Sequence, residues 1–148
     1  MKTRDTSLQL ADELMVGNWP LNLPKSSLPG PAPLSEVRSH HWEGEFLHYR
    51  STVIGPTGAQ SNVSFAARQD GTEFQVLGNP AADSIAIVHA GPRAWFSTVR
   101  LRGRITRENH VFLSADGNTL VSVGHEIGID GKKISSSLLI YDRLTTGV

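Results

Sequence analysis

The sequence predicts an all-β protein, an antiparallel up-and-down barrel of about eight to ten strands with a short N-terminal helix. After Pro33, short runs rich in Val, Ile, Phe, Tyr and Thr alternate with turn signals such as Asp70-Gly71 and Asp130-Gly131, at intervals of about 8–15 residues. This spacing is typical of consecutive hairpins and leaves no long crossover connection. With 148 residues, the chain is expected to form one domain, residues 1–148.

The individual elements follow from local patterns. A helix is expected over residues 7–15, which Gly17 ends, because apolar residues recur there at helical spacing: Leu8, Ala11, Leu14 and Met15. The stretch GNWPLNLPKSSLPGPAP, residues 17–33, predicts a strand near 17–23 followed by a proline-rich connection that crosses one end of the barrel. The remaining strands are expected at residues 36–43, 45–54, 60–68, 73–77, 83–89, 94–101, 104–113, 119–127 and 133–142.

The faces of the strands favour a barrel with a ligand-containing lumen. In EFLHYRSTVI, residues 45–54, both alternating sets mix apolar and polar side chains. A β-sandwich, the second alternative, would need one purely apolar face on such a strand. Closure into a barrel also removes the two unpaired edges of a long open sheet.

Composition excludes several classes of function. Lys plus Arg and Asp plus Glu number 14 each, so the net charge is zero and nothing indicates binding to nucleic acid or to a membrane. Because the chain has no cysteine, disulfides, thiolate metal sites and cysteine nucleophiles are ruled out. The N-terminal stretch MKTRDTSLQLADELM is too charged for a secretory signal, so a cytoplasmic protein is expected.

Three segments resemble a family of bacterial lipocalin-like (calycin-type) proteins. GNWPLNLPKSS is similar to its G-x-W-x-L-N-x-x-K-S opening, and RQDGTEFQVLGNPAADSIAI and LSADGNTLVSVGHEIGIDGKKISSSLLIYDR are similar to later motifs. The resemblance covers most of residues 17–143 and implies a lipocalin-like antiparallel barrel around a cavity. It also implies a structural pair at the closed end of the barrel, in which Arg143 lies against Trp19.

The histidines and aromatic residues are the candidate site. If Trp42 points inward, His40 does so too, and the apolar neighbours of Tyr49 and His125 place these two residues in the same lumen. His40, Tyr49 and His125 are therefore the candidate catalytic residues, because imidazoles lowered in pKa by burial can act as bases near pH 7. The candidate ligand-binding residues are Trp42, Phe65, Trp95 and Tyr141.

Other chemistries have little support. No metal or cofactor is expected, because no H-x-H pattern occurs and adjacent His40 and His41 face opposite sides of a strand, although ligands from different strands remain an alternative. An arginine series, Arg100, Arg102 and Arg104 with Arg93 and Arg107 nearby, is read first as a solvated outer face. If the series instead faces inward, the ligand would be anionic.

Two functions remain open at this point. The first is a cofactor-independent enzyme of secondary metabolism, a cyclase, isomerase or lyase that folds a small apolar or amphiphilic substrate inside the lumen. The alternative is a non-catalytic carrier of lipocalin type that only binds such a molecule. The expected partner is in both cases a small hydrophobic or amphiphilic organic molecule, and a homodimer is one open possibility for the assembly.

Overall fold

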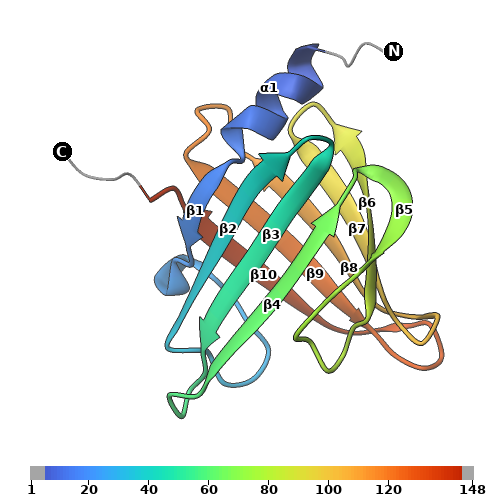
Figure 1. Cartoon of the computed structure of the whole chain (residues 1–148). Helices are drawn as coiled ribbons and strands as arrows, with labels where there is room; N and C mark the ends of the chain where they lie inside the picture. The colour runs from blue at the N-terminus through green and yellow to red at the C-terminus, as the bar shows by residue number, and fades with distance from the viewer. Residues whose placement is uncertain (1–5, 145–148) are drawn as a thin grey trace.

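The described part of the chain is all-β with one α-helix, as the sequence predicts. The computed structural model describes residues 6–144, so the ends of the predicted domain, residues 1–5 and 145–148, lie outside it. Within this range helix α1 spans Thr6–Leu14, the 3-10 helix η1 spans Leu23–Lys25, and all strand pairs are antiparallel (Figure 1). The strands are β1 (Gly17–Pro20), β2 (Ser35–Glu43), β3 (Phe46–Ile54), β4 (Gln60–Ala67), β5 (Asp70–Gln75), β6 (Ser84–Gly91), β7 (Ala94–Leu101), β8 (Arg104–Leu113), β9 (Thr119–Ile127) and β10 (Lys133–Asp142).

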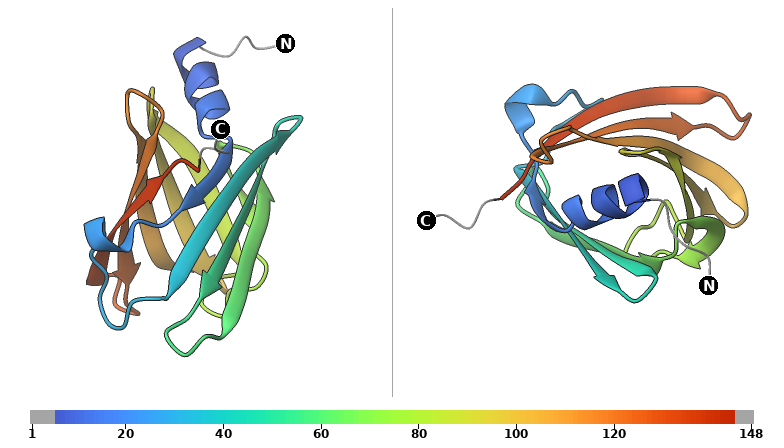
Figure 2. Two further views of the ribbon diagram at one scale, coloured as in Figure 1. Left: turned by 90° about the vertical axis from the view of Figure 1, so that its left-hand side faces the viewer. Right: turned by 90° about the horizontal axis from the view of Figure 1, so that it is seen from above.

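The strands form two curved sheets that face each other. One sheet has the order β1-β2-β3-β4 and the other β10-β9-β8-β7-β6-β5, so neighbours in sequence are neighbours in space, as in a meander. Isolated bridges join the sheets at both edges: Leu21 pairs with Tyr141 and Ser27 with Leu138 on one side, and Ser64 with Leu77 on the other. The result is a flattened barrel (Figure 2) whose ladder is interrupted at two places instead of running continuously.

A glycine permits the junction beside β4. Leu77 and Ser64 exchange two backbone hydrogen bonds of 2.9 and 3.0 Å. Gly78 follows directly with a φ of +82°, and a Cβ at this position would lie 2.0 Å from the carbonyl oxygen of Asn62. Only glycine allows this backbone conformation and this close approach, so Gly78 holds the β5–β6 connection against the edge of β4.

Helix α1 closes one end of the barrel, whereas the proline-rich segment runs along the side of β10 and, contrary to expectation, does not cross this end. After β1, the chain turns through η1 and bonds to β10, with Asn22 donating its backbone N–H to Ile140 at 2.7 Å. Helix α1 lies across the barrel end (Figure 2), where Ala11 and Met15 are buried. Leu8, the first residue of the predicted apolar pattern, is in the helix, but its side chain is not among those that the structure describes. None of the helices among residues 6–144 has the length and apolar character needed to cross a bilayer.

Trp19 and Arg143 meet beneath this helix. Trp19 is fully buried, and its indole Nε1 donates a hydrogen bond to the carbonyl oxygen of Met15 at 2.9 Å. The Arg143 guanidinium lies 4.4 Å from the centre of the Trp19 ring and donates to the carbonyl oxygens of Leu14, Val16 and Gly117. The pair thus ties the end of α1, strand β1 and the segment after β10 together.

Replacing Arg143 with methionine is expected to lower the free energy of unfolding by about 2–3 kcal/mol. The variant keeps much of the apolar stem but loses the cation–π contact and leaves the carbonyl oxygens around it without a donor. Urea unfolding at pH 7 measures the change. Arg102→Met, in the exposed β7–β8 turn, is the matched control and should stay within about 0.5 kcal/mol of the unaltered protein. Equal losses for the two variants would contradict this role of Arg143.

Candidate functional site

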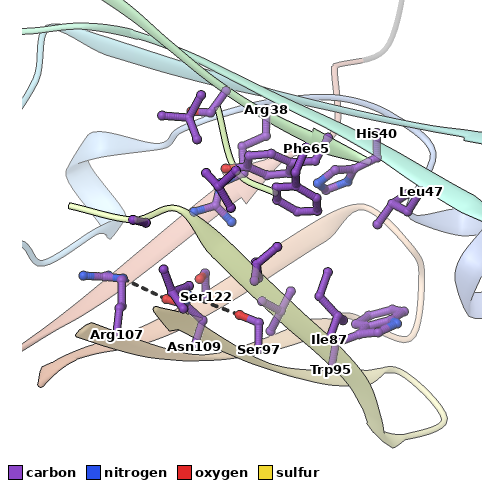
Figure 3. Close-up of a pocket in the computed structure, with 18 of the residues that line it drawn as sticks. Arg38, His40, Leu47, Phe65, Ile87, Trp95, Ser97, Arg107, Asn109 and Ser122 are labelled. Atoms are coloured by element: carbon purple, nitrogen blue, oxygen red, sulfur yellow. Dashed lines mark hydrogen bonds between the residues drawn. The ribbon is translucent and has the colours of Figure 1, made fainter. Parts of the chain in front are cut away.

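The barrel encloses a cavity of about 300 Å³ between its two sheets. Figure 3 shows side chains from both sheets converging on it. Most of the lining side chains are apolar, and we call the polar side chains Arg38, Ser97, Arg107, Asn109 and Ser122 the polar belt. The lining residues are Met15, Glu36, Arg38, His40, Leu47, Tyr49, Ser51, Val53, Val63, Phe65, Gln69, Val76, Asn79, Ala82, Ile85, Ile87, Trp95, Ser97, Val99, Arg107, Asn109, Val111, Leu120 and Ser122.

Aromatic rings form the wall on the side of the smaller sheet. His40 on β2, Tyr49 on β3 and Phe65 on β4 are register partners, because His40 pairs with Tyr49 and Tyr49 with Phe65. The Tyr49 and Phe65 rings stack with centres 4.6 Å apart, and the His40 ring lies 5.6 Å from that of Tyr49. Trp95 on β7 faces them from the larger sheet (Figure 3).

Arg38 is the first charged group of the polar belt. Its Nε donates to Glu36 Oε2 at 3.2 Å, and its guanidinium lies 4.3 Å from the centre of the Tyr141 ring. The Tyr141 hydroxyl donates to the same Glu36 carboxylate. Glu36 therefore accepts from two neighbours, while the guanidinium of Arg38 still reaches the cavity (Figure 3).

Arg107 is the second charged group and comes from the opposite sheet. Its Nε donates to Asn109 Oδ1 at 2.9 Å and its Nη2 to Ser137 Oγ at 2.8 Å, and the Asn109 amide in turn donates to Ser97 Oγ at 3.1 Å. These partners are all neutral. A Cβ at residue 124 would lie 2.0 Å from Arg107 Nη2, so Gly124 on β9 makes the room in which the guanidinium lies.

The two arginines raise the positive potential of the cavity. Burial lowers the pKa of Arg107, and the charge of Arg38 lowers it further. Among the described residues, Glu36 is the single carboxylate that lines the cavity, against these two guanidinium groups. Because charges interact strongly in a partly dry interior, this excess favours an anionic guest.

A further hydrogen-bond donor of the cavity is the side-chain amide of Gln69, which lies beside Trp95. The Nε2 of Gln69 is buried and has no hydrogen-bond partner, whereas its Oε1 accepts from Trp95 Nε1 at 3.3 Å. Buried donors without partners are uncommon in proteins, because each costs about 1–3 kcal/mol. Since Gln69 lines the cavity, an acceptor on a bound molecule could satisfy it.

His40 is a neutral imidazole with a defined tautomer. Its Nδ1 lies 3.1 Å from the carbonyl oxygen of Met15, which can only accept, so Nδ1 carries the proton and Nε2 the lone pair. Burial lowers the pKa of His40 to about 4; the Met15 hydrogen bond opposes this shift and the charge of Arg38 adds to it.

The stability of the protein is expected to fall between pH 7 and pH 4, in part because of His40. An imidazole in the unfolded chain takes up its proton near pH 6.5, whereas His40 in the folded protein does so near pH 4. The unfolded state therefore binds more protons in this window, which removes up to about 3 kcal/mol as the pH falls. His40→Asn keeps a donor for Met15 but does not titrate, so its urea-unfolding free energy should depend less steeply on pH. Equal slopes for His40→Asn and the unaltered protein would contradict the assignment.

The structure brings together four of the seven residues that the sequence suggests for catalysis and binding. His40, Tyr49, Phe65 and Trp95 line the cavity. Trp42 lies on the same side of β2 as His40 but closer to α1, and its Nε1 donates to the carbonyl oxygen of Asp12 in that helix at 3.0 Å. It is not among the lining residues. Tyr141 is fully buried behind Arg38 and is not among them either.

The expected inward position of His125 is wrong. Its Nδ1 lies 2.8 Å from Ser136 Oγ on the outer surface, and its ring contacts that of His110. The inward side of β9 holds Leu120 and Ser122, two residues that line the cavity. Val121 and Val123, which lie on the same side of β9 as His125, suggested that this side faces the lumen.

The arginine series divides between the two faces. Arg100 points outward and pairs with Glu73 at 3.1 Å, and Arg102 and Arg104 are exposed in and beside the β7–β8 turn. A register shift follows, because Val99 pairs with Arg107 but Arg100 with Ile105. This bulge breaks the simple alternation, and Arg107 alone among these four arginines lines the cavity.

Comparisons with known proteins support the fold. No model of a protein family matches the sequence, and no curated protein matches it. Among solved structures, the chain is similar to the ileal bile acid-binding protein of zebrafish in complex with cholic acid, at 10% sequence identity and a TM-score of 0.52, over 88% of this chain and 99% of that chain. This similarity shows the fold alone: the chain is an antiparallel β-barrel with the same overall fold as that protein.

Proposed function

We propose that this protein binds a small amphiphilic molecule with an anionic group inside its barrel, as a carrier and not as an enzyme. The observation that carries the proposal is the pair of guanidinium groups, Arg38 and Arg107, which enter the same apolar cavity from opposite sheets (Figure 3). Carboxylates and similar anions form the strongest hydrogen bonds with such groups. The fold similarity to a bile acid-binding protein agrees with this proposal.

The layout of the walls defines how the ligand would lie. Its anionic group would bind at the polar belt, between Arg38 and the Arg107–Asn109 pair. Its apolar part would extend toward Phe65 and Trp95, where aromatic and aliphatic side chains provide contact area. A cavity of about 300 Å³ is at the lower end of the range for ligand pockets, so a medium-length chain or a small ring system fits it.

The pKa directions favour binding over acid–base catalysis. A general base works best when its pKa lies near the operating pH, and that of His40 is about 4. Burial raises the pKa of Tyr49, so its phenol keeps its proton near pH 7 and can donate a hydrogen bond but does not readily transfer the proton. With His125 on the outer surface, the three candidate catalytic residues do not form one acid–base set.

A series of ligands with the same tail and different charge tests the proposal. Decanoate, 1-decanol and decylamine share a ten-carbon chain, and isothermal titration calorimetry measures their affinities for the full chain. Decanoate should bind about tenfold or more tightly than 1-decanol, because hydrogen bonds to a charged group contribute about 1.5–3 kcal/mol. Decylamine should bind most weakly of the three.

The outcomes separate the alternatives. Equal affinity for decanoate and 1-decanol would overturn the preference for an anionic ligand. Tightest binding of decylamine would show that the cavity prefers a cation instead. His40→Asn and Tyr49→Phe should change decanoate affinity by less than about tenfold, as expected for residues that only line the wall. If a substrate is found whose turnover falls about a hundredfold in either variant, the enzyme alternative would replace the carrier.

A further inference from the structure

A second cluster of functional side chains lies on the outer surface of the β2–β3 hairpin. His41 on β2 pairs directly with His48 on β3, and their rings stack with centres 4.9 Å apart at an interplanar angle of 19°. Glu43 is two residues beyond His41, so it projects from the same side of the strand. His40, which directly precedes His41, points the other way into the cavity, so the two clusters are separate.

The three side chains already converge on one point. His41 Nε2 lies 3.5 Å from Glu43 Oε1, and His48 Nε2 lies 3.3 Å from Glu43 Oε2. One ligand atom of each residue can be chosen so that all three lie within 4.8 Å of one another. In a tetrahedral zinc site with bonds of about 2.0–2.1 Å, neighbouring ligand atoms are about 3.4 Å apart. Small side-chain rotations would therefore place an ion between them without a change in the backbone.

The donor types and the exposure fit a divalent transition metal. Two imidazoles and one carboxylate are a common set of three protein ligands for zinc, and they leave a fourth position for water. The side chains of His41, Glu43 and His48 are 58%, 67% and 34% exposed, so an ion can enter from solvent. Among residues 6–144, no other group of three such ligands converges in this way.

We propose that His41, Glu43 and His48 form a Zn²⁺ site on the outer surface of the hairpin. The ion would link β2 to β3 close to their turn at Gly44, at the barrel end that α1 covers (Figure 1). Because the ligands come together only in the folded hairpin, binding would stabilise the folded state by mass action. The site makes no use of the lumen, so it does not depend on the identity of the internal ligand.

Zinc titration of the full chain, freed of metal with a chelator, tests the site. Calorimetry should show one Zn²⁺ bound per chain and a higher thermal midpoint with zinc present. His41→Gln, Glu43→Gln and His48→Gln should each weaken binding by about tenfold or more, since even loss of an outer partner of a metal ligand costs 10–100-fold. All three residues are at least one-third exposed, so the variants should fold normally.

The chain offers a matched control on its other sheet. His110 and His125 also lie side by side, with ring centres 6.1 Å apart, but they are not part of a convergent group of three ligands. The double variant His110→Gln/His125→Gln should therefore keep the zinc affinity of the unaltered protein. Unchanged affinity in the three cluster variants, or loss of affinity in the double variant alone, would overturn the proposal.

Discussion

Replacing Arg107 with methionine is expected to weaken decanoate binding by about 30-fold or more. Loss of one partner from a buried charged pair costs about 2 kcal/mol at least, and each 1.4 kcal/mol is a factor of ten in affinity. Methionine fills much of the same volume, and the neutral partners Asn109 and Ser137 remain available to each other or to water. The affinity for 1-decanol should change far less, since an alcohol does not need the second positive charge.

Arg100→Met is the matched control for this experiment. Arg100 lies seven positions earlier on the neighbouring strand, has the same charge, and points outward to its ion pair with Glu73. Its replacement removes one positive charge from the protein without changing the cavity. If Arg100→Met and Arg107→Met weakened decanoate binding equally, the effect would come from the net charge of the protein and not from the lumen.

Replacing Trp19 with alanine should lower the free energy of unfolding by about 3–5 kcal/mol. The indole is fully buried, so its removal leaves a cavity, and both its hydrogen bond to Met15 and its contact with Arg143 are lost. Urea unfolding monitored by circular dichroism measures the loss. Trp19→Phe should lower stability by less, because it retains the ring but not the Nε1 donor.

The control for this prediction is an aromatic residue of the outer surface. Phe112 on β8 is 44% exposed, and Phe112→Ala should cost less than about 1 kcal/mol. A comparable loss in Phe112→Ala and Trp19→Ala would show that position in the core does not determine the effect. It would contradict the view that the Trp19–Arg143 pair holds the helix-covered end of the barrel together.

The order and the bounds of most strands follow from the sequence because turn residues mark them. The predicted strands at 94–101, 104–113, 119–127 and 133–142 coincide with β7 to β10. Strand β5 differs, since it was expected at 73–77 and spans Asp70–Gln75. Asp70-Gly71 suggested a turn, yet Gly71, at a φ of +85°, lies within the strand where its pairing with β6 is irregular.

Which side of a strand faces the lumen was only partly predictable. On β3, Tyr49 could be placed inward because it lies on the same side of the strand as Leu47 and Val53. On β9 both sides carry apolar residues, so the pattern does not distinguish them; in the structure the side chain of Arg107 on β8 lies close to Gly124 on the inward side of β9. Such a contact depends on the register between two strands, which neither strand determines alone.

The outer histidine pair could have been found from the sequence. The short turn at Gly44-Glu45 places Glu43 opposite Phe46, and this register brings His41 directly opposite His48. The alternative of metal ligands from different strands did not pair His41 with His48 across the hairpin. Arg38 could also have been found, because it alternates in step with His40 and Trp42 and therefore lies on the same side of β2.

The most direct test of the proposed function locates the anionic group of the ligand inside the protein. Nuclear magnetic resonance of the arginine side chains, recorded while decanoate is added, reports on each Nε–H separately. We expect large shifts for the Nε–H groups of Arg38 and Arg107, with those of the outer Arg100 and Arg102 unchanged. Shifts confined to the outer arginines, or binding of decanoate without any change at Arg38 and Arg107, would contradict the proposed function.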